Sequence, residues 1–102
     1  MNQAQMMAQV RKMQAEMTKA QEELASAVVS GSAGGGLVTV EMTCDYHVKS
    51  VRLDKQAIDP ADSETLEDLI VVALNDALTK AQETSNKRMG ALTGGLRIPG
   101  MM

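Results

Sequence analysis

The sequence predicts an α+β fold of order α-β-β-β-α, in which two long helices flank a small antiparallel sheet. Three observations predict it. Residues 1–29 contain no glycine or proline and are rich in helix-forming side chains. Residues 37–44 alternate between apolar and polar side chains, as a half-buried strand does. Residues 66–81, within an expected helix over residues 60–90, carry apolar residues at intervals of three and four, the spacing of an amphipathic helix.

The expected first helix, residues 1–29, carries a heptad stripe of apolar residues on a mostly polar surface. The stripe consists of Met6, Val10, Met13, Met17, Ala20, Leu24 and Ala27. Methionine packs adaptably and specifies a partner weakly. We interpret the stripe as a contact surface for another helix rather than as a methionine metal site.

A glycine-rich segment, residues 30–36, follows, and we expect a flexible hinge there. A phosphate-binding loop is a poor alternative, because such a loop follows a strand and opens a helix. Residues 37–58 predict a β-hairpin with a short third strand at residues 56–58. The spacing of Val48, Val51 and Leu53 departs from strict alternation, which indicates a bulge or an edge strand.

The second helix is expected over residues 60–90, after the helix-start sequence of residues 59–63 and before Gly90. Residues 91–102 are expected to form a flexible tail. We treat residues 1–102 as one domain. A chain of this size buries only about 60–65% of the surface of its unfolded state, so a partner subunit would help it fold.

The charge is divided unevenly along the chain, although the net charge is only −3. Residues 1–20 hold three basic residues against one acid, and residues 79–102 hold four against one. The remainder holds three basic residues against eleven acids. Each helix would be about 35–40 Å long at 1.5 Å per residue, so the start of the first and the finish of the second should project beyond the sheet. The basic segments therefore coincide with the projecting ends, where they suit phosphate binding; ordinary solvated helix faces are the alternative.

No catalytic constellation, cofactor site or small-molecule substrate site is predicted. Cys44 and His47 supply one possible pair of zinc ligands per chain, so a zinc site would need two subunits. The acids of residues 59–68 lack the spacing of a calcium loop. A single cysteine permits no internal disulfide. No run of apolar residues has the length of about 20 residues that is needed to cross a membrane. We therefore expect a cytoplasmic location.

Four stretches in order resemble the YbaB/EbfC family of nucleoid-associated proteins, over nearly the full chain. They are residues 5–24, residues 34–40 with Gly-Gly-Gly-Leu-Val-Thr-Val, residues 66–77, and residues 94–101 with Gly-Gly-Leu-Arg-Ile-Pro-Gly-Met. The resemblance implies a tweezer-like homodimer, joined through sheets and central helices, whose protruding arms bind double-stranded DNA. One departure is the turn at residues 43–47, where many members have an Asn-Gly turn.

The resemblance also implies two sets of site residues in this sequence. The expected DNA-binding residues are Arg11, Lys12, Lys19, Lys80, Lys87, Arg88 and Arg97. The expected dimer-interface residues are Val38, Val40, Met42, Leu66, Leu69 and Ile70. Our hypothesis is a non-enzymatic, nucleoid-associated homodimer that grips DNA phosphates with little sequence preference. The alternative is a small acidic dimeric adaptor or chaperone that binds proteins through its methionines.

Overall fold

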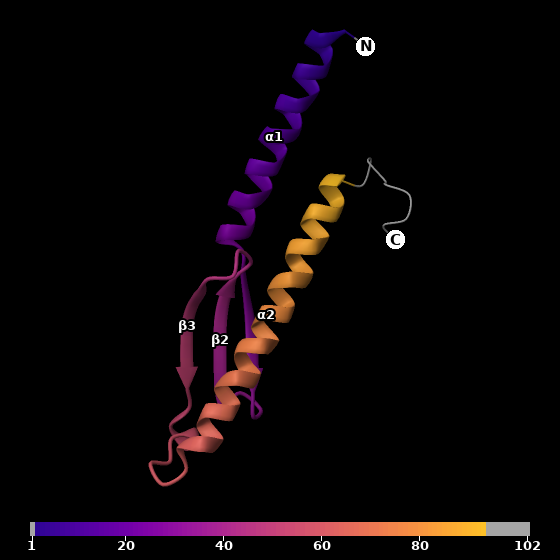
Figure 1. Ribbon diagram of the computed structural model, residues 1–102. Coiled ribbons are helices and arrows are strands. Elements are labelled where there is room, and N and C mark those ends of the chain that lie inside the picture. Colours follow the sequence, from indigo (N-terminus) through magenta and orange to yellow (C-terminus); the bar gives the residue numbers. More distant parts are fainter. Residues whose placement is uncertain (1, 94–102) are drawn as a thin grey trace, which may run out of the picture.

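The computed structural model describes residues 2–93, which form a helix, three strands and a second, longer helix (Figure 1). The elements are α1 (Gln3–Ser26), β1 (Val28–Ala33), β2 (Val38–Thr43), β3 (Val48–Leu53), the 3-10 helix η1 (Lys55–Ala57) and α2 (Ser63–Thr93). The sheet is antiparallel throughout, in the order β1-β2-β3. The predicted fold class and the order α-β-β-β-α are confirmed.

The strand β1 corrects two predicted boundaries. Helix α1 ends at Ser26 rather than at residue 29, and β1 pairs with β2 over its whole length, where a hinge over residues 30–36 was predicted. Only the turn after β1 has the backbone conformation expected of a glycine-rich segment, since Gly34, Gly35 and Gly36 have φ angles of 64°, 69° and 99°. The small residues of β1 resemble a chain breaker in the sequence. They form a strand because α2 packs directly on them.

The core is the contact between α2 and the sheet. Ala73, Ala77 and Ala81, four residues apart on one face of α2, are fully buried against β1 and β2. At Gly31 the approach is so close that an added Cβ would lie 2.8 Å from the Ala77 Cα and closer still to backbone atoms of the same helix. A larger residue in β1 would therefore separate the helix from the sheet.

The inner face of β2 completes this core, and it carries three of the residues predicted for the dimer interface. Val38 and Val40 are 0% exposed and Met42 is 5% exposed in the single chain. In the single chain these three side chains belong to the core formed with α2, and their part in a dimer stays a prediction. Leu66, Leu69 and Ile70 are half-buried at the margin of the same core.

Three further boundaries differ from the prediction. The expected strand at residues 56–58 is replaced by η1, and the third strand is β1. Helix α2 begins at Ser63, because Asp62 accepts a hydrogen bond from the Thr65 backbone N–H (3.3 Å) and another from its hydroxyl (2.7 Å). Gly90 does not end the helix. Of the predicted tail, residues 91–93 are helical and residues 94–102 lie outside the described residues.

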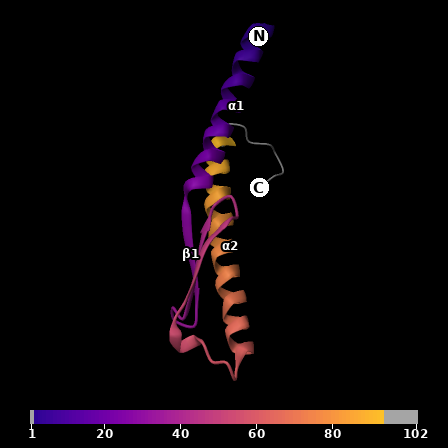
Figure 2. The same ribbon diagram turned by 90° about the vertical axis from the view of Figure 1, so that its left-hand side faces the viewer.

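The far ends of α1 and α2 both project from the same end of the sheet, as the helix lengths predicted (Figures 1 and 2). The molecule measures 70 × 28 × 16 Å, and its radius of gyration is 19.5 Å. A compact chain of this length would have a radius of gyration of about 13 Å. Across residues 2–93, neither helix has the length and apolarity required of a membrane span.

The close approach at Gly31 predicts that Gly31→Ala destabilises the fold, since overpacking of a well-packed core costs about 1–3 kcal/mol. Thermal unfolding followed by circular dichroism measures the effect. Gly90→Ala is the matched control: no heavy atom lies within 4 Å of its added Cβ, and alanine is the better helix former by about 1 kcal/mol. Melting temperatures that move in the same direction for the two variants would contradict this account of β1.

Candidate nucleic-acid interface

The projecting part of α1, residues 3–19, is the first of two basic arms. All of its side chains are exposed in the single chain. Arg11, Lys12 and Lys19 belong to this arm, and none of them forms an ion pair within residues 2–93. By helical geometry Lys12 and Lys19 lie on the face turned away from the apolar stripe, and Arg11 lies at its edge, beside Met6 and Val10. Their charges are therefore available to an external anion.

The last part of α2, residues 82–93, follows the last buried alanine and is the second arm. Lys87 is exposed and, within the described chain, forms no ion pair. Arg88 differs, because its Nε donates to Glu23 Oε2 at 2.7 Å. This bond joins α2 to the base of the α1 arm. The hydrogen bond from Arg88, supported by the charges of Arg88 and Lys19, lowers the pKa of Glu23.

Among the expected DNA-binding residues, Lys80 is bonded to the sheet. Its Nζ donates to the Ser30 carbonyl at 2.9 Å and to Asp76 Oδ2 at 3.2 Å. The same carboxylate oxygen accepts from the Ser32 backbone N–H at 3.0 Å. The Ser32 hydrogen bond and then the Lys80 bond lower the pKa of Asp76. Lys80 therefore ties α2 to β1 at the base of the arm.

The two arms face each other across a groove lined by Glu16 and Lys19 from α1 and by Arg88, Ala91 and Leu92 from α2. Of the expected DNA-binding residues, Lys19 and Arg88 are brought together here. Arg97 lies outside the described residues. Sequence reasoning missed Glu23, because nothing in its surroundings along the chain distinguishes it from other surface acids.

The turn between β2 and β3 holds the α1 arm at its base. The Cys44 backbone N–H donates to the carbonyls of Leu24 and Ala27, both at 3.0 Å. Cys44 is 1% exposed, whereas the His47 side chain is 79% exposed. Within residues 2–93 no three His, Cys, Asp or Glu side chains gather as a metal site would require.

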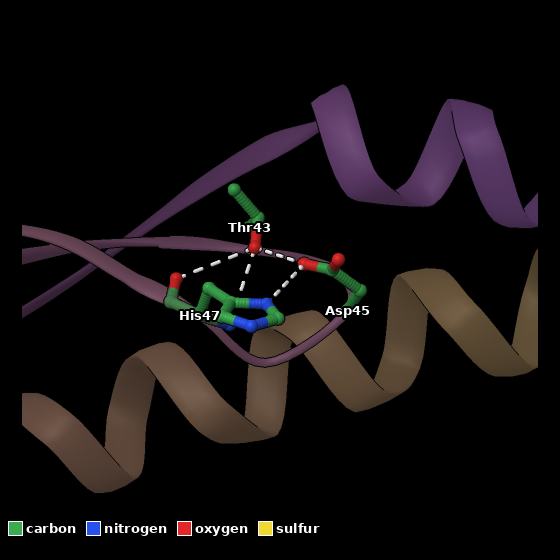
Figure 3. Close-up of polar contacts among 3 residues, drawn as sticks. All are labelled: Thr43, Asp45 and His47. Atoms are coloured by element: carbon green, nitrogen blue, oxygen red, sulfur yellow. Dashed lines mark hydrogen bonds and ion pairs between the residues drawn. The ribbon is translucent and has the colours of Figure 1, made fainter.

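The turn itself is fixed by three side chains (Figure 3). Asp45 accepts a hydrogen bond from the Thr43 hydroxyl, and His47 Nδ1 lies 3.1 Å from the same carboxylate oxygen. The Thr43 bond, followed by the His47 bond, lowers the pKa of Asp45. Tyr46 has a φ of 72°, a left-handed conformation that non-glycine residues rarely adopt. These bonds replace the Asn-Gly chemistry expected in such a turn.

Comparison with known proteins identifies relatives over nearly the whole chain. The model of the YbaB/EbfC DNA-binding family matches residues 1–96. A nucleoid-associated protein of Chloroflexus aurantiacus is 48% identical over 97 residues, which cover 95% of this chain and 97% of that protein. One of Syntrophobacter fumaroxidans is 50% identical over 95 residues, covering 93% of this chain and 86% of that protein.

A solved structure shares the fold. The crystal structure of the uncharacterised protein HP0035 from Helicobacter pylori superposes with a TM-score of 0.81. The match covers 92% of this chain and 99% of that chain, at 20% sequence identity.

The two carboxylates with lowered pKa values at the arm bases predict how stability depends on pH. A group whose pKa is lowered by folding stabilises the protein above its unfolded pKa, and this contribution is lost as the pH falls through the folded pKa. The ordinary pKa values of these groups are 4.5 for Glu23 and 3.8 for Asp76. We therefore expect Glu23→Gln with Asp76→Asn to make the free energy of unfolding fall less steeply between about pH 5 and about pH 3.

Denaturant titrations at a series of pH values measure this slope. Glu22→Gln with Asp76→Asn is the matched control, because Glu22 neighbours Glu23 but forms no ion pair within residues 2–93. Equal slopes for the two double variants would show that the Glu23 contact with Arg88 contributes nothing.

Proposed function

This chain belongs to the YbaB/EbfC DNA-binding family, a family of non-enzymatic nucleoid-associated proteins, and we propose that it grips duplex DNA as a homodimer through phosphate contacts from its two arms. One observation carries the proposal: Arg11, Lys12, Lys19 and Lys87 lie on the two projecting arms without an ion-pair partner among the described residues. Cations that are already exposed and unpaired can bind phosphate without first breaking an internal contact.

The charge of the rest of the molecule favours binding at the arms. Residues 21–78 hold eleven acids against three basic residues, and they include the sheet and the first half of α2. This acidic body repels the DNA backbone, so the orientation in which the arms meet the duplex has the lowest electrostatic free energy. The near absence of aromatic residues, 1% of the chain, disfavours recognition by base stacking and favours contacts to phosphate.

The uncovered part of the sheet supports the homodimer. Directly opposed residues of an antiparallel pair share a face, so Val48 and Val51 of β3 share the inner face of Met42 and Val40. Helix α2 crosses β1 and β2 and leaves these two valines 49% and 46% exposed. We therefore assign the inner face of β3 to the contact with a second copy, and the half-buried Leu66, Leu69 and Ile70 of α2 stay predicted contact residues.

A protein-binding adaptor is the alternative function, and the exposed methionines of α1 are the observation that favours it. Salt separates the two functions. Phosphate binding weakens steeply between about 50 mM and about 200 mM salt, because bound counterions are released, whereas apolar binding does not.

The DNA-binding proposal predicts that Arg11→Glu, Lys12→Glu and Lys87→Glu together abolish a mobility shift of duplex DNA. Removing three phosphate-binding cations from each subunit should also flatten the plot of log affinity against log salt by about 2.7 per subunit. A gel mobility-shift assay measures the first quantity, and fluorescence anisotropy of labelled, unrelated duplexes, in a salt series that begins low enough for residual binding, measures the second.

The matched control reverses three basic residues of the body: Lys49→Glu, Arg52→Glu and Lys55→Glu. All three are exposed, and both triple variants acquire the same net charge. We expect the control to retain most of its affinity. An equal reduction in the two variants would mean that net charge, and not the position of the arms, controls binding.

The dimer proposal predicts that Val51→Lys halves the mass measured by sedimentation velocity, since a charge on the inner face of β3 would be buried in the contact. Ser50→Lys is the matched control. Ser50 lies on the opposite face, beside Glu41, whose carboxylate is 3.1 Å from the Ser50 hydroxyl and can pair with the new lysine. A Val51→Lys protein with unchanged mass would place the dimer contact elsewhere.

A further inference from the structure

The apolar stripe of α1 is covered in its second half and bare in its first half. Ala20 is 0% exposed and Leu24 is 6% exposed, because α2 and β2 pack against this end of α1. Towards the N-terminus the same stripe is exposed. The exposed fractions are 55% for Met6, 53% for Val10, 40% for Met13 and 44% for Met17. The bare half is thus continuous with an existing packing surface and begins where the cover from α2 ends.

The spacing of the bare residues indicates the shape of what covers them. Alternating steps of four and three residues are the repeat by which one helix packs along another helix that runs beside it. A phosphate backbone or an irregular surface has no such repeat. A helix of about 12–15 residues without tertiary contacts is marginal in water, so the exposed half of α1 gains stability from such a partner.

The charges around the stripe suit a second copy of α1. The residues that flank it on the exposed arm are mostly uncharged, including Gln9 and Gln14, and Glu16 is the one acid among them. Lys12 lies on the opposite face of the helix, and Arg11 lies at the edge of the stripe, where it lines a surface hollow with Met6 and Val10. Two identical helices can therefore approach stripe to stripe with Lys12 on the outside of the pair and Arg11 at its edge.

We propose that the Met6 to Met17 stripe is a second self-association surface, at which the α1 arms of two copies pair as a short coiled coil. It is separate from the inner face of β3. A chain that uses both surfaces links two dimers, and the pair of arms presents basic faces on two opposite sides. The pairing stands whether or not the arms bind DNA. Only its consequence, the joining of two duplexes in one particle, rests on the proposed function.

The test compares the full-length chain with Val10→Gln/Met13→Gln, by sedimentation velocity over a range of protein concentrations. Glutamine keeps the helix but removes the apolar contact. The matched control, Ala8→Gln/Ala15→Gln, adds the same side chains to the opposite face. We expect the stripe variant to have half the mass of the wild type at the highest concentration, and the control to match the wild type.

Capture of a labelled duplex by a duplex on beads then measures the joining of DNA. The stripe variant should still shift a single duplex, while its capture falls at least tenfold. Equal masses for all three proteins overturn the pairing, even where every one of them shifts DNA. A mass that halves in the stripe variant while no protein shifts DNA supports the pairing and contradicts the proposed function.

A second measurement covers the case in which the stripe variant unfolds. In a Cys44→Ala background, a short bismaleimide should cross-link two copies through Met13→Cys but not through Ala15→Cys on the far face. Equal cross-linking at both positions, or none at either, overturns the proposal.

Discussion

The approach of α2 to β1 is the contact on which the rest of the molecule depends. Ala73 and Ala77 face Gly31 at a distance that excludes even one further methyl group. Small residues on both sides let a helix lie almost on the backbone of a strand, and the position of the helix axis is then fixed within narrow limits. Because that axis lies over β1 and β2, the inner face of β3 stays uncovered. This close packing contact thus also leaves exposed the surface that we propose as the contact with a second copy.

The same axis determines where the arms begin. As α2 leaves the sheet it passes the end of α1, and Arg88 reaches Glu23 there. The turn between β2 and β3 holds the other side of this junction, where the Cys44 N–H donates to two carbonyls at the end of α1. Beyond the junction, residues 3–19 of α1 are exposed in the single chain, so the junction sets the direction of the arm. The bonds of Thr43, Asp45 and His47 thus contribute to the geometry of an arm that they do not touch.

The sequence was sufficient for the features that follow from local chemistry. Helical spacing predicted both helices, alternation predicted β2, and the division of charge predicted basic arms. It was not sufficient for β1, because Ser30, Gly31 and Ser32 have the local preferences of a loop and form a strand only through contact with α2. For the same reason Arg88 looked equivalent to Lys87. Its partner, Glu23, is 65 residues away along the chain.

These internal partners divide the basic residues into two kinds with different physical effects. A phosphate that binds Lys87 gains a new contact, whereas a phosphate that binds Arg88 must displace a carboxylate at 2.7 Å. Replacing the Glu23 carboxylate by a phosphate at Arg88 yields little net electrostatic energy. It also breaks the bond that joins α2 to the base of the α1 arm. In the proposed complex Arg88 therefore contributes most by holding α1 and α2 at a fixed separation, and a fixed separation lowers the entropic cost of placing several cations along one duplex at once. The arm residues proposed to bind phosphate and the residue that joins the two arms are chemically alike, and only their neighbours in space distinguish them.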